Sequence, residues 1–361
     1  MKWLFILCIL GASILIGGLL FYTSIIAYER TEEVLEGEPL FIASGESHAL
    51  ETITFVGDIM LSRDVENTMK KYGASYPYTH IEEYLASRVV VGNFQSAIPS
   101  VHIPTPSMTM RFSVDPVFIP ALRDAGFTHL SLANNHAFDY GQEGYTNAQD
   151  ILRQSGMVPF GHPYELATTS VSYVEGAGRT VALVGIYAVV ANPSVTELST
   201  LMEVVRAQSD LQIAYIHWGN EYELAHSDLQ ETLARNLIAE GVDLIVGHHP
   251  HVVQDIAVYE GVPVFYSLGN FVFDQYFNSD VQEGLMVTLS FDGTEDAYVE
   301  VIPVSSINSR VSPRILTGYE RTRFLEALAK RSDTSISDVI QEGIIPVSFP
   351  SNELHMTNNS I

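Results

Sequence analysis

The chain has 361 residues, 47% of them hydrophobic, which is enough to bury one large core or two ordinary ones and excludes a mini-protein. Its 43 acidic and 18 basic residues give a formal net charge of -25 at pH 7, and this charge would repel phosphodiester backbones. We therefore expect no nucleic-acid partner, and a cationic ion or substrate group is the better expectation.

The amino end, residues 1–28, is predicted to be a transmembrane anchor. Residues 3–28 carry no charged side chain, and a helix rising about 1.5 Å per residue over this length can cross a bilayer core of roughly 30 Å. A cleaved signal peptide is the alternative, but its apolar run would be shorter. Lys2 before the run and glutamates after it point to a single-pass protein of the cell membrane with an extracytoplasmic body. The only cysteine, Cys8, falls within the run, so no disulfide can form in the exported part.

Beyond a polar linker at residues 29–50, short apolar runs alternate with helix-like stretches through a domain at 51–305. This alternation predicts an α/β layered domain rather than an all-β one. Residues 306–361 are expected to form a C-terminal helical extension and tail, in which no function is evident. Strands are predicted at 53–56, 89–91, 130–133, 181–185, 213–216, 244–246 and 264–266, a closing hairpin at 285–289 and 298–302, and helices at 64–72, 117–125, 144–154, 197–208 and 229–240.

Three histidines within four positions, in Gly247-His248-His249-Pro250-His251, give the strongest local signal. The apolar run 242–246 before them predicts a buried strand, and ligands of open α/β sheets bind beyond the carboxyl ends of strands. Imidazole suits zinc, iron, nickel or copper, so the cluster favours a transition metal or a mixed nitrogen and oxygen site. A histidine-rich surface turn is the alternative.

Two early strands also end in side chains of ligand type. Asp58 follows the strand at 53–56, where a helix cap or a turn is the alternative reading. Asn93 and Gln95 follow the strand at 89–91, where they could equally hold a turn. Neither pattern is specific alone, but both fall where the histidine cluster would need partners.

Two later strands repeat the pattern. His217 ends the strand at 213–216 and is followed by Trp218-Gly219 and by Glu221, and a lone core histidine is the alternative. Because several other strands end in the same way, we interpret His217 as a ligand. The segment 267–274, which contains Asn270, follows the last predicted strand and is expected to lie beneath the site.

The segment 132–141 places two amides, an imidazole and a carboxylate directly after an apolar strand. Each of these polar groups needs a partner if it is buried, so their concentration suggests a purpose. An asparagine carbonyl can bind a metal while the adjacent His136, free of the metal, donates a proton to a leaving oxygen. Asp139 could fix the tautomer of that imidazole. An asparagine-rich turn that caps the following helix is the alternative.

Taken in order, these motifs resemble the capsule-synthesis CapA family, which is associated with poly-γ-glutamate capsules and is similar to the calcineurin-like metallophosphatases. The resemblance covers about residues 52–304 and rests on Gly57-Asp58-Ile59-Met60, Asn134-Asn135-His136 with Asp139 and Gly141, His217-Trp218-Gly219 with Glu221, Gly247-His248-His249-Pro250-His251, and Ser267-Leu268-Gly269-Asn270-Phe271. It implies a four-layer αββα metallophosphatase-like sandwich with a metal centre at one edge of two stacked sheets.

The resemblance also implies roles for individual residues. His136 matches the catalytic histidine, with Asp139 as its partner. The implied metal ligands are Asp58, Gln95, Asn135, His217, His249 and His251. Residues expected to contact substrate or to support the ligands are Asn93, Asn134, Glu221, His248 and Asn270. The implied cofactor is one or more divalent metal ions, with manganese, iron and zinc as the candidates.

Two departures from the family pattern weaken the first metal position. Gln95 offers a neutral amide where the family usually has a glutamate, and Met60 stands where phosphatases of the superfamily have a histidine. A centre with one metal, or with little metal, therefore stays open. The leading hypothesis is a membrane-anchored, extracytoplasmic protein of the CapA type that hydrolyses a phosphoester or amide during biosynthesis, release or anchoring of a polymer such as poly-γ-glutamate. The alternative is a non-catalytic accessory subunit, and the expected partners are an anionic surface polymer or its synthase complex, with the membrane bound through the N-terminal helix.

Overall fold

The computed structural model describes residues 40–42, 52–87, 89–107, 109–176, 179–291 and 296–349. The predicted anchor lies outside the described residues, and no described helix has both the length and the apolar character needed to span a bilayer. Residues 40–42, which the sequence placed in the linker, form strand β1 (Leu40–Ile42), which runs parallel to β6 (Val171–Gly176).

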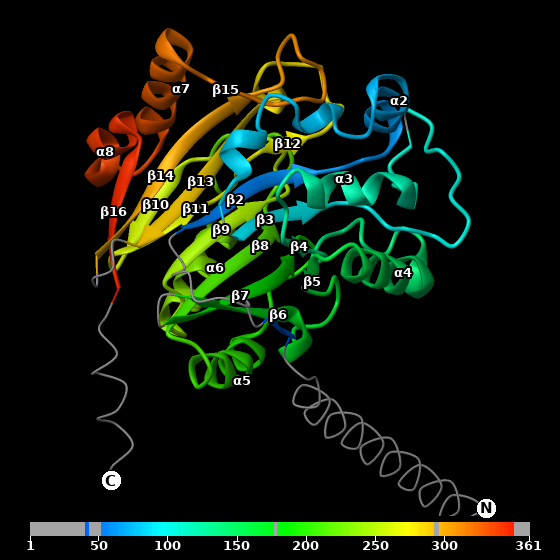
Figure 1. The fold of residues 1–361 in the computed structure, drawn as a ribbon. Coiled ribbons are helices and arrows are strands. Elements are labelled where there is room, and N and C mark those ends of the chain that lie inside the picture. Colours follow the sequence, from blue (N-terminus) through cyan, green and yellow to red (C-terminus); the bar gives the residue numbers. More distant parts are fainter. Residues whose placement is uncertain are drawn as a thin grey trace, which may run out of the picture. The chain divides into compact units, whose positions relative to one another are not determined.

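Two mixed β-sheets with helices packed against them make up the described part of the chain (Figure 1). The other strands are β2 (Thr52–Ile59), β3 (Val89–Phe94), β4 (His129–Ser131), β5 (Val158–Phe160), β7 (Arg179–Ala188), β8 (Leu211–Trp218), β9 (Leu244–His248), β10 (Ile256–Tyr259), β11 (Val262–Phe265), β12 (Asn270–Val272), β13 (Glu283–Phe291), β14 (Asp296–Ser305), β15 (Arg314–Ile315) and β16 (Ile344–Ser348). The helices are α2 (Arg63–Tyr72), α3 (Ile119–Asp124), α4 (Gly141–Gln154), α5 (Val195–Arg206), α6 (Asp228–Ala239), α7 (Gly318–Arg331) and α8 (Ser337–Glu342), with short 3₁₀ turns η1 (Tyr76–Tyr78), η2 (Glu82–Leu85), η3 (Pro116–Phe118), η4 (Thr168–Ser170), η5 (Asp280–Gln282) and η6 (Thr334–Ile336).

The strand order of the first sheet is β1-β6-β7-β8-β9-β11-β10, and that of the second is β15-β14-β13-β2-β3-β4-β5, with β12 paired to β2 and β16 to β14. Strands β2 to β5 run parallel to one another, and so do β7, β8, β9 and β11. Because parallel strands end at the same edge, each sheet collects the side chains that follow its strands along one edge.

Successive residues of the central strands point to opposite faces, which divides the core into three apolar clusters. Phe55 and Val91 of one sheet meet Tyr215 of the other in the cluster between the sheets. Val56 points instead to the cluster under α2, α3 and α4, and Ile216 points to the cluster under α5 and α6. Both faces of each sheet are therefore buried, and the predicted α/β sandwich is confirmed at this level.

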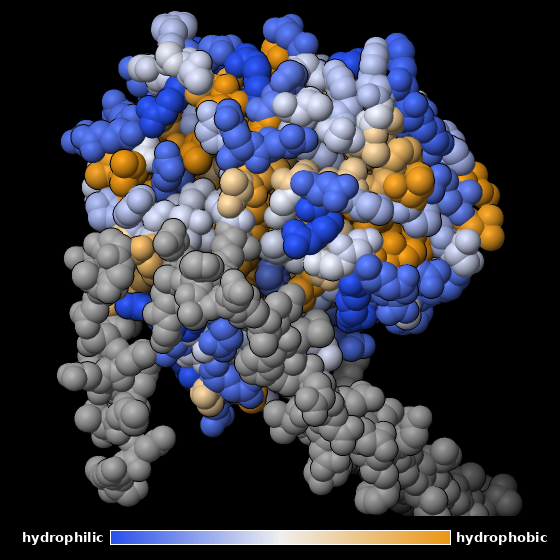
Figure 2. Space-filling model, viewed as in Figure 1, coloured by the Kyte–Doolittle hydropathy of each residue, from blue (hydrophilic) through white to orange (hydrophobic). Residues whose placement is uncertain are grey.

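Within the described residues, the predicted strands, the hairpin and the predicted helices of the domain are present, although their ends differ by a few residues. Helix α5 begins two residues before the predicted start because Ser194 accepts a bond from Glu197 N while the Glu197 side chain accepts from Ser194 N. Ser227 and Gln230 form the same capping box at α6. On the face shown in Figure 2, hydrophobic side chains form separate spots among hydrophilic ones, which is ordinary for a protein surface.

Residues beyond 305 complete the second sheet and the core. Strand β16 pairs antiparallel with β14, and Phe324, Leu328 and Ile340 of α7 and α8 join the cluster between the sheets. Ile256 N donates to Ser332 Oγ at 2.9 Å, which fixes the end of α7 to β10. Figure 1 shows α7 and α8 beside β14 and β16, on the side away from α2 and α4.

Candidate metal centre

Side chains of ligand type from both sheets meet where the parallel strands end. In one sheet Asp58 of β2 lies between Asn93 of β3 and Asn270 of β12 in the strand register. In the other sheet His217 of β8 is paired with His248 of β9. The two groups contact each other across the space between the sheets, so residues from separate parts of the sequence share one site.

Glycines beneath the site allow the backbones to approach closely. A Cβ at Gly57 would lie 2.0 Å from the carbonyl oxygen of Gly269, and a Cβ at Gly247 would lie 2.1 Å from that of Tyr266. Neither position has room for a side chain, so glycine is required at both. Asp58 N donates to Gly269 O at 2.9 Å, and this bond fixes the backbone that carries the carboxylate.

Asn93 links the two sheets at the base of the site. Its Nδ2 donates to Asp58 Oδ1 at 2.7 Å and to His217 Nδ1 at 2.9 Å. Because Nδ1 accepts this bond, the neutral His217 ring carries its proton on Nε2, which donates to Asn135 Oδ1 at 3.0 Å. His217 Nε2 and Asn135 Oδ1 are thus close enough for both to reach one cation when the ring proton is on Nδ1 instead, with the Asn93 amide turned so that its oxygen accepts from Nδ1.

His249 and His251 are on a strained loop that faces Glu221. Their φ angles are 100° and 59°, in the left-handed region that residues with a side chain rarely adopt, and such strain is concentrated at functional sites. One ligand atom each from Glu221, His249 and His251 lie within 4.8 Å of one another, so these three side chains could hold a metal ion. Tyr222 N donates to Pro250 O at 2.8 Å and ties the two loops together.

Two oxygen atoms orient the His251 ring through its Nδ1. Asn270 Oδ1 and Asp58 Oδ2 each lie 3.0 Å from this nitrogen, so Nδ1 donates and Nε2 is left as the ligand atom. Asn270 is itself held by bonds that its Nδ2 donates to Gln275 Oε1 at 3.0 Å and to Val281 O at 2.9 Å. Asp58 therefore supports a candidate ligand in addition to being one.

Burial sets the protonation of these groups. It lowers the pKa of His248 and His249 to about 4 and holds the pKa of His217 well below its ordinary value, with neighbouring imidazoles adding to the effect at His217 and His249. Burial alone would raise the pKa of Asp58, but the His251 hydrogen bond and the nearby imidazoles outweigh it and hold that pKa below its usual range. Neutral imidazole and ionised carboxylate are the forms that bind metal ions.

Several buried polar atoms at this edge have no hydrogen-bond partner among the described residues. They are both side-chain polar atoms of Gln95, both ring nitrogens of His248 and Nδ1 of His249. Asp58 Oδ2 also lacks a well-aligned hydrogen bond, although His251 Nδ1 is 3.0 Å away. Each such atom costs about 1–3 kcal/mol, so their concentration in one place fits a site built for a ligand. A donor set of imidazole, amide and carboxylate is suited to a divalent transition metal.

His136 and Asp139 form a pair beside this donor set. His136 Nδ1 lies 2.9 Å from Asp139 Oδ2, which also accepts from Phe112 N at 2.6 Å. The carboxylate favours the tautomer with the proton on Nδ1, so Nε2 is free to exchange a proton, and Asn135 Nδ2 lies 3.3 Å from it. The centre of the Phe112 ring is 4.1 Å from that of His136, which restricts the imidazole further.

The family model of the bacterial capsule synthesis protein PGA_cap matches residues 52–275 of this chain. This stretch supplies every candidate ligand. The chain belongs to this family. The PGA_cap domain is itself part of the metallophosphatase-like superfamily. The chain is 32% identical over 307 residues to the capsule biosynthesis protein CapA of Bacillus anthracis, with 79% of this chain and 74% of that protein covered.

Two further relatives match this chain over a comparable or a shorter length. The PGA biosynthesis protein CapA of Bacillus subtilis (strain 168) is 30% identical over 297 residues, which cover 78% of each chain. A probable polyglutamine synthesis accessory protein of Mycobacterium tuberculosis (strain H37Rv) is 25% identical over 190 residues, covering 45% of this chain and 50% of that protein.

Some residues of this PGA_cap domain take positions that the sequence did not specify. Asn134 uses its side chain within the fold, because Nδ2 donates to Asn93 Oδ1 at 3.1 Å and Oδ1 accepts from His136 N at 3.0 Å. His248 is buried with its ring centre 4.1 Å from that of Tyr215. Glu221, expected only as a supporting residue, lies within reach of the metal that His249 and His251 would bind.

Sequence reasoning missed Phe112 and its neighbour Arg111. Both belong to an irregular segment that is held near β3 by a bridge between Ala97 and Ser113. No hydrophobic period or spacing in the segment pointed to a contact with His136. The structure reveals it through the Phe112 ring against His136 and through the bonds from Phe112 N and Arg111 Nε to Asp139.

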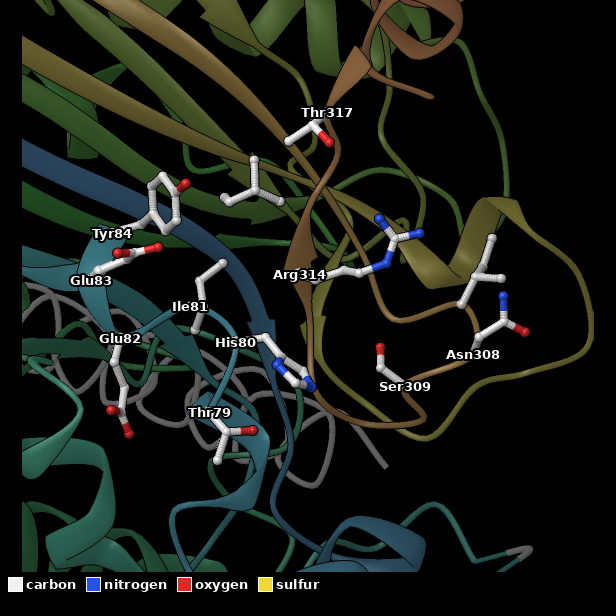
Figure 3. A pocket seen from close by; sticks show the side chains of 12 residues that line it. Thr79, His80, Ile81, Glu82, Glu83, Tyr84, Asn308, Ser309, Arg314 and Thr317 are labelled. Carbon is white, nitrogen blue, oxygen red and sulfur yellow. The ribbon is translucent and has the colours of Figure 1, made fainter. Parts of the chain in front are cut away.

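The residues that line a separate cavity of about 710 Å³ are shown in Figure 3. Its wall includes His80, Glu83 and Tyr84 from one segment and Asn308 and Arg314 from another. The predicted site residues do not line it. We therefore assign the chemistry of this PGA_cap domain to the strand ends rather than to this cavity.

Proposed function

We propose that this protein is a membrane-anchored, extracytoplasmic and metal-dependent hydrolase that acts in the biosynthesis, release or anchoring of a surface polymer such as poly-γ-glutamate. The observation that carries the proposal is the set of buried donor atoms at the strand ends, several of them without a partner in the described part of the chain. Membership of a capsule-synthesis family supports the choice of polymer.

The residues divide into a binding group and a proton-transfer group. His217, Asn135, His249, His251 and Glu221 are the residues that would hold one or more divalent metal ions, which would supply Lewis acidity and an activated water. Asp58 and Asn270 keep the His251 ring in place. His136, with its tautomer set by Asp139, would donate a proton to the leaving atom of a phosphoester or an amide.

A non-catalytic accessory subunit that binds the polymer or its synthase is the second candidate. Its specific support is Gln95, which offers an amide where a bridging carboxylate would bind metal more strongly. A Mycobacterium tuberculosis relative carries the name of a probable polyglutamine synthesis accessory protein. In this reading the metal centre shapes the binding surface and no bond is cleaved.

Gln95→Glu tests these two readings against each other. A carboxylate brings full charge to the buried position, so we expect metal affinity to rise roughly tenfold or more, with more metal bound per chain. As a hydrolase, the wild type should cleave a model phosphodiester or a γ-glutamyl amide, lose the activity on chelation, and gain rate in the variant. Metal analysis and hydrolysis rates measure both effects.

Gln212→Glu is the matched control, because Gln212 is a buried glutamine at the start of β8, whereas the candidate ligand His217 lies at the end of that strand. It should leave the metal content unchanged. If Gln95→Glu raises bound metal and neither protein hydrolyses either substrate, the accessory reading replaces the hydrolase. If Gln95→Glu changes neither metal content nor activity, Gln95 is not at a metal position.

The topology proposal has a direct test in intact cells or protoplasts. The charge-free run at 3–28 and the glutamates after it support a body outside the membrane. Added protease should therefore digest residues 52–349 without permeabilisation and spare the first helix. A body that is protected until the membrane is opened would overturn this topology.

A further inference from the structure

Arg111 presents a fixed guanidinium beside the pair His136–Asp139. Its Nε donates to the backbone oxygen of Asp139 at 2.6 Å, and its Cζ lies 4.1 Å from the centre of the Tyr140 ring. The ring and the backbone oxygen together hold the plane of the guanidinium in one orientation. Arg111 remains exposed, and within the described residues its two Nη atoms donate no hydrogen bond.

The segment that carries Arg111 is anchored on its other side as well. His102 Nδ1 lies 2.7 Å from Ser113 Oγ, and His102 Nε2 lies 2.9 Å from the buried carboxylate of Glu66. Ser62 Oγ donates to Ser113 O at 2.8 Å. A guanidinium on such a support loses little freedom when it binds a ligand, which favours affinity.

Arg111 is also adjacent to the catalytic candidate through two contacts. Phe112, the next residue, packs its ring against His136, and Asp139 accepts bonds from Arg111, Phe112 and His136 at once. A group held by the Arg111 Nη atoms would therefore lie near the Asp139 backbone, on the segment that also carries His136.

The charge of Arg111 is available, whereas that of a nearby arginine is not. Arg63 also contacts the Phe112 ring, with its Cζ 4.7 Å from the ring centre, but it is paired with Asp274 and is buried. Arg111 has no carboxylate partner within the described residues, in a chain whose net charge is -25. An exposed cation kept free of so many acidic side chains has the properties of a ligand-binding group.

We propose that Arg111 is the residue that recognises an oxyanion of the substrate next to the bond that His136 would help to cleave. The planar fork of arginine matches a carboxylate or a phosphate through two parallel hydrogen bonds, and lysine does not reproduce this geometry. The inference rests on the proposed function and makes it more specific. The oxyanion is a carboxylate if the substrate is a glutamyl polymer, and a phosphate if it is a phosphoester.

The test measures binding, so that it does not depend on catalysis. Fluorescently labelled γ-linked triglutamate, its neutral analogue in which each free carboxylate is an amide, and phenyl phosphate would be titrated into the metal-loaded full chain. Arg111→Gln should weaken binding of one anionic probe about tenfold, and Arg111→Lys should restore little of it, because the loss is one charge-assisted contact. Arg235→Gln is the matched control, since Arg235 also stacks on a tyrosine, with its Cζ 4.0 Å from the Tyr259 ring, away from the site.

Triglutamate binding that depends on Arg111 identifies a carboxylate, and phenyl phosphate binding that depends on it identifies a phosphate. The inference is wrong if the wild type binds the amidated analogue as tightly as triglutamate and the binding of phenyl phosphate is unchanged by Arg111→Gln. It is also wrong if neither anionic probe binds the wild type. A merely structural role for Arg111 would appear instead as a lower melting temperature and metal content in Arg111→Gln.

The same titration separates this inference from the hydrolase proposal. Binding that depends on Arg111 in a protein that cleaves no substrate leaves the recognition role standing and removes the catalytic one. If the protein does hydrolyse the probe, Arg111→Gln should raise KM more than it lowers kcat.

Discussion

Replacing His249 and His251 together with alanine should remove the bound metal from a folded protein. Both rings are buried, and one ligand atom of each lies within 4.8 Å of a Glu221 oxygen. Loss of supporting residues alone costs about 10- to 100-fold in metal affinity, so loss of two direct ligands should cost at least about 100-fold. Metal analysis of the purified full chain, with circular dichroism to establish folding, measures the effect.

The double substitution should also lower the stability of the fold more than substitutions in an exposed loop would. The sequence placed these histidines on a loop outside the core, but the structure buries them, and His251 Nδ1 lies 3.0 Å from both Asn270 Oδ1 and Asp58 Oδ2. Leaving Asn270 Oδ1 and Asp58 Oδ2 buried without His251 costs about 1–3 kcal/mol each. His129→Ala, which removes a buried imidazole at the start of β4, is the control for burial without metal binding. A folded double variant with unchanged metal stoichiometry would reject both residues as ligands.

The central strands could be predicted because each sheet is buried on both faces. Runs such as 244–246 are apolar at every position, and this pattern is typical of parallel strands covered by helices. The short strands β5, β10 and β12 were missed, since three or four residues give no period to detect. Strand β16 alternates exposed and buried residues, but it was not predicted because it directly follows a stretch with a helical pattern.

The sequence could predict which residues gather at the candidate site, but not which of them contact one another. Chain order placed polar residues after parallel strands, and this identified Asn135, His217 and the histidine loop. It could not show that Asn93 would join Asp58 to His217 across the two sheets, because that bond depends on how the sheets stack. It also gave Glu221 a supporting role, since the spacing of 28 residues to His249 carries no information on distance in space.

Two features of the structure favour a site at the ends of the parallel strands over one in the cavity near Arg314. Buried polar atoms without a partner are costly wherever they lie, and among the described residues Gln95, His248 and His249 each carry such atoms just at or after the end of a parallel strand, although others lie elsewhere. The backbone strain at His249 and His251 falls in the same place. Two independent costs concentrated at one point are best explained by a ligand that offsets both.

His136→Ala should lower hydrolysis about 10²- to 10⁴-fold while leaving the metal in place, because general acid catalysis contributes that range and this ring is not among the candidate ligands. Asp139→Asn should give a smaller loss, since the amide can still accept from His136 Nδ1 at the position of Oδ2 but no longer stabilises the protonated ring. Rates with a model phosphodiester and a γ-glutamyl amide, measured beside metal content, separate these effects.

The chain offers a matched pair for control. His226 Nδ1 lies 2.6 Å from Asp255 Oδ2, so this histidine is also supported by a carboxylate, but its ring stacks on Tyr266 rather than facing the donor set. His226→Ala and Asp255→Asn should leave the rate per folded molecule unchanged. If His136→Ala retains full activity with full metal content, His136 is not the proton donor. If it loses metal and activity together, the ring acts as a ligand and the division between binding and proton transfer fails.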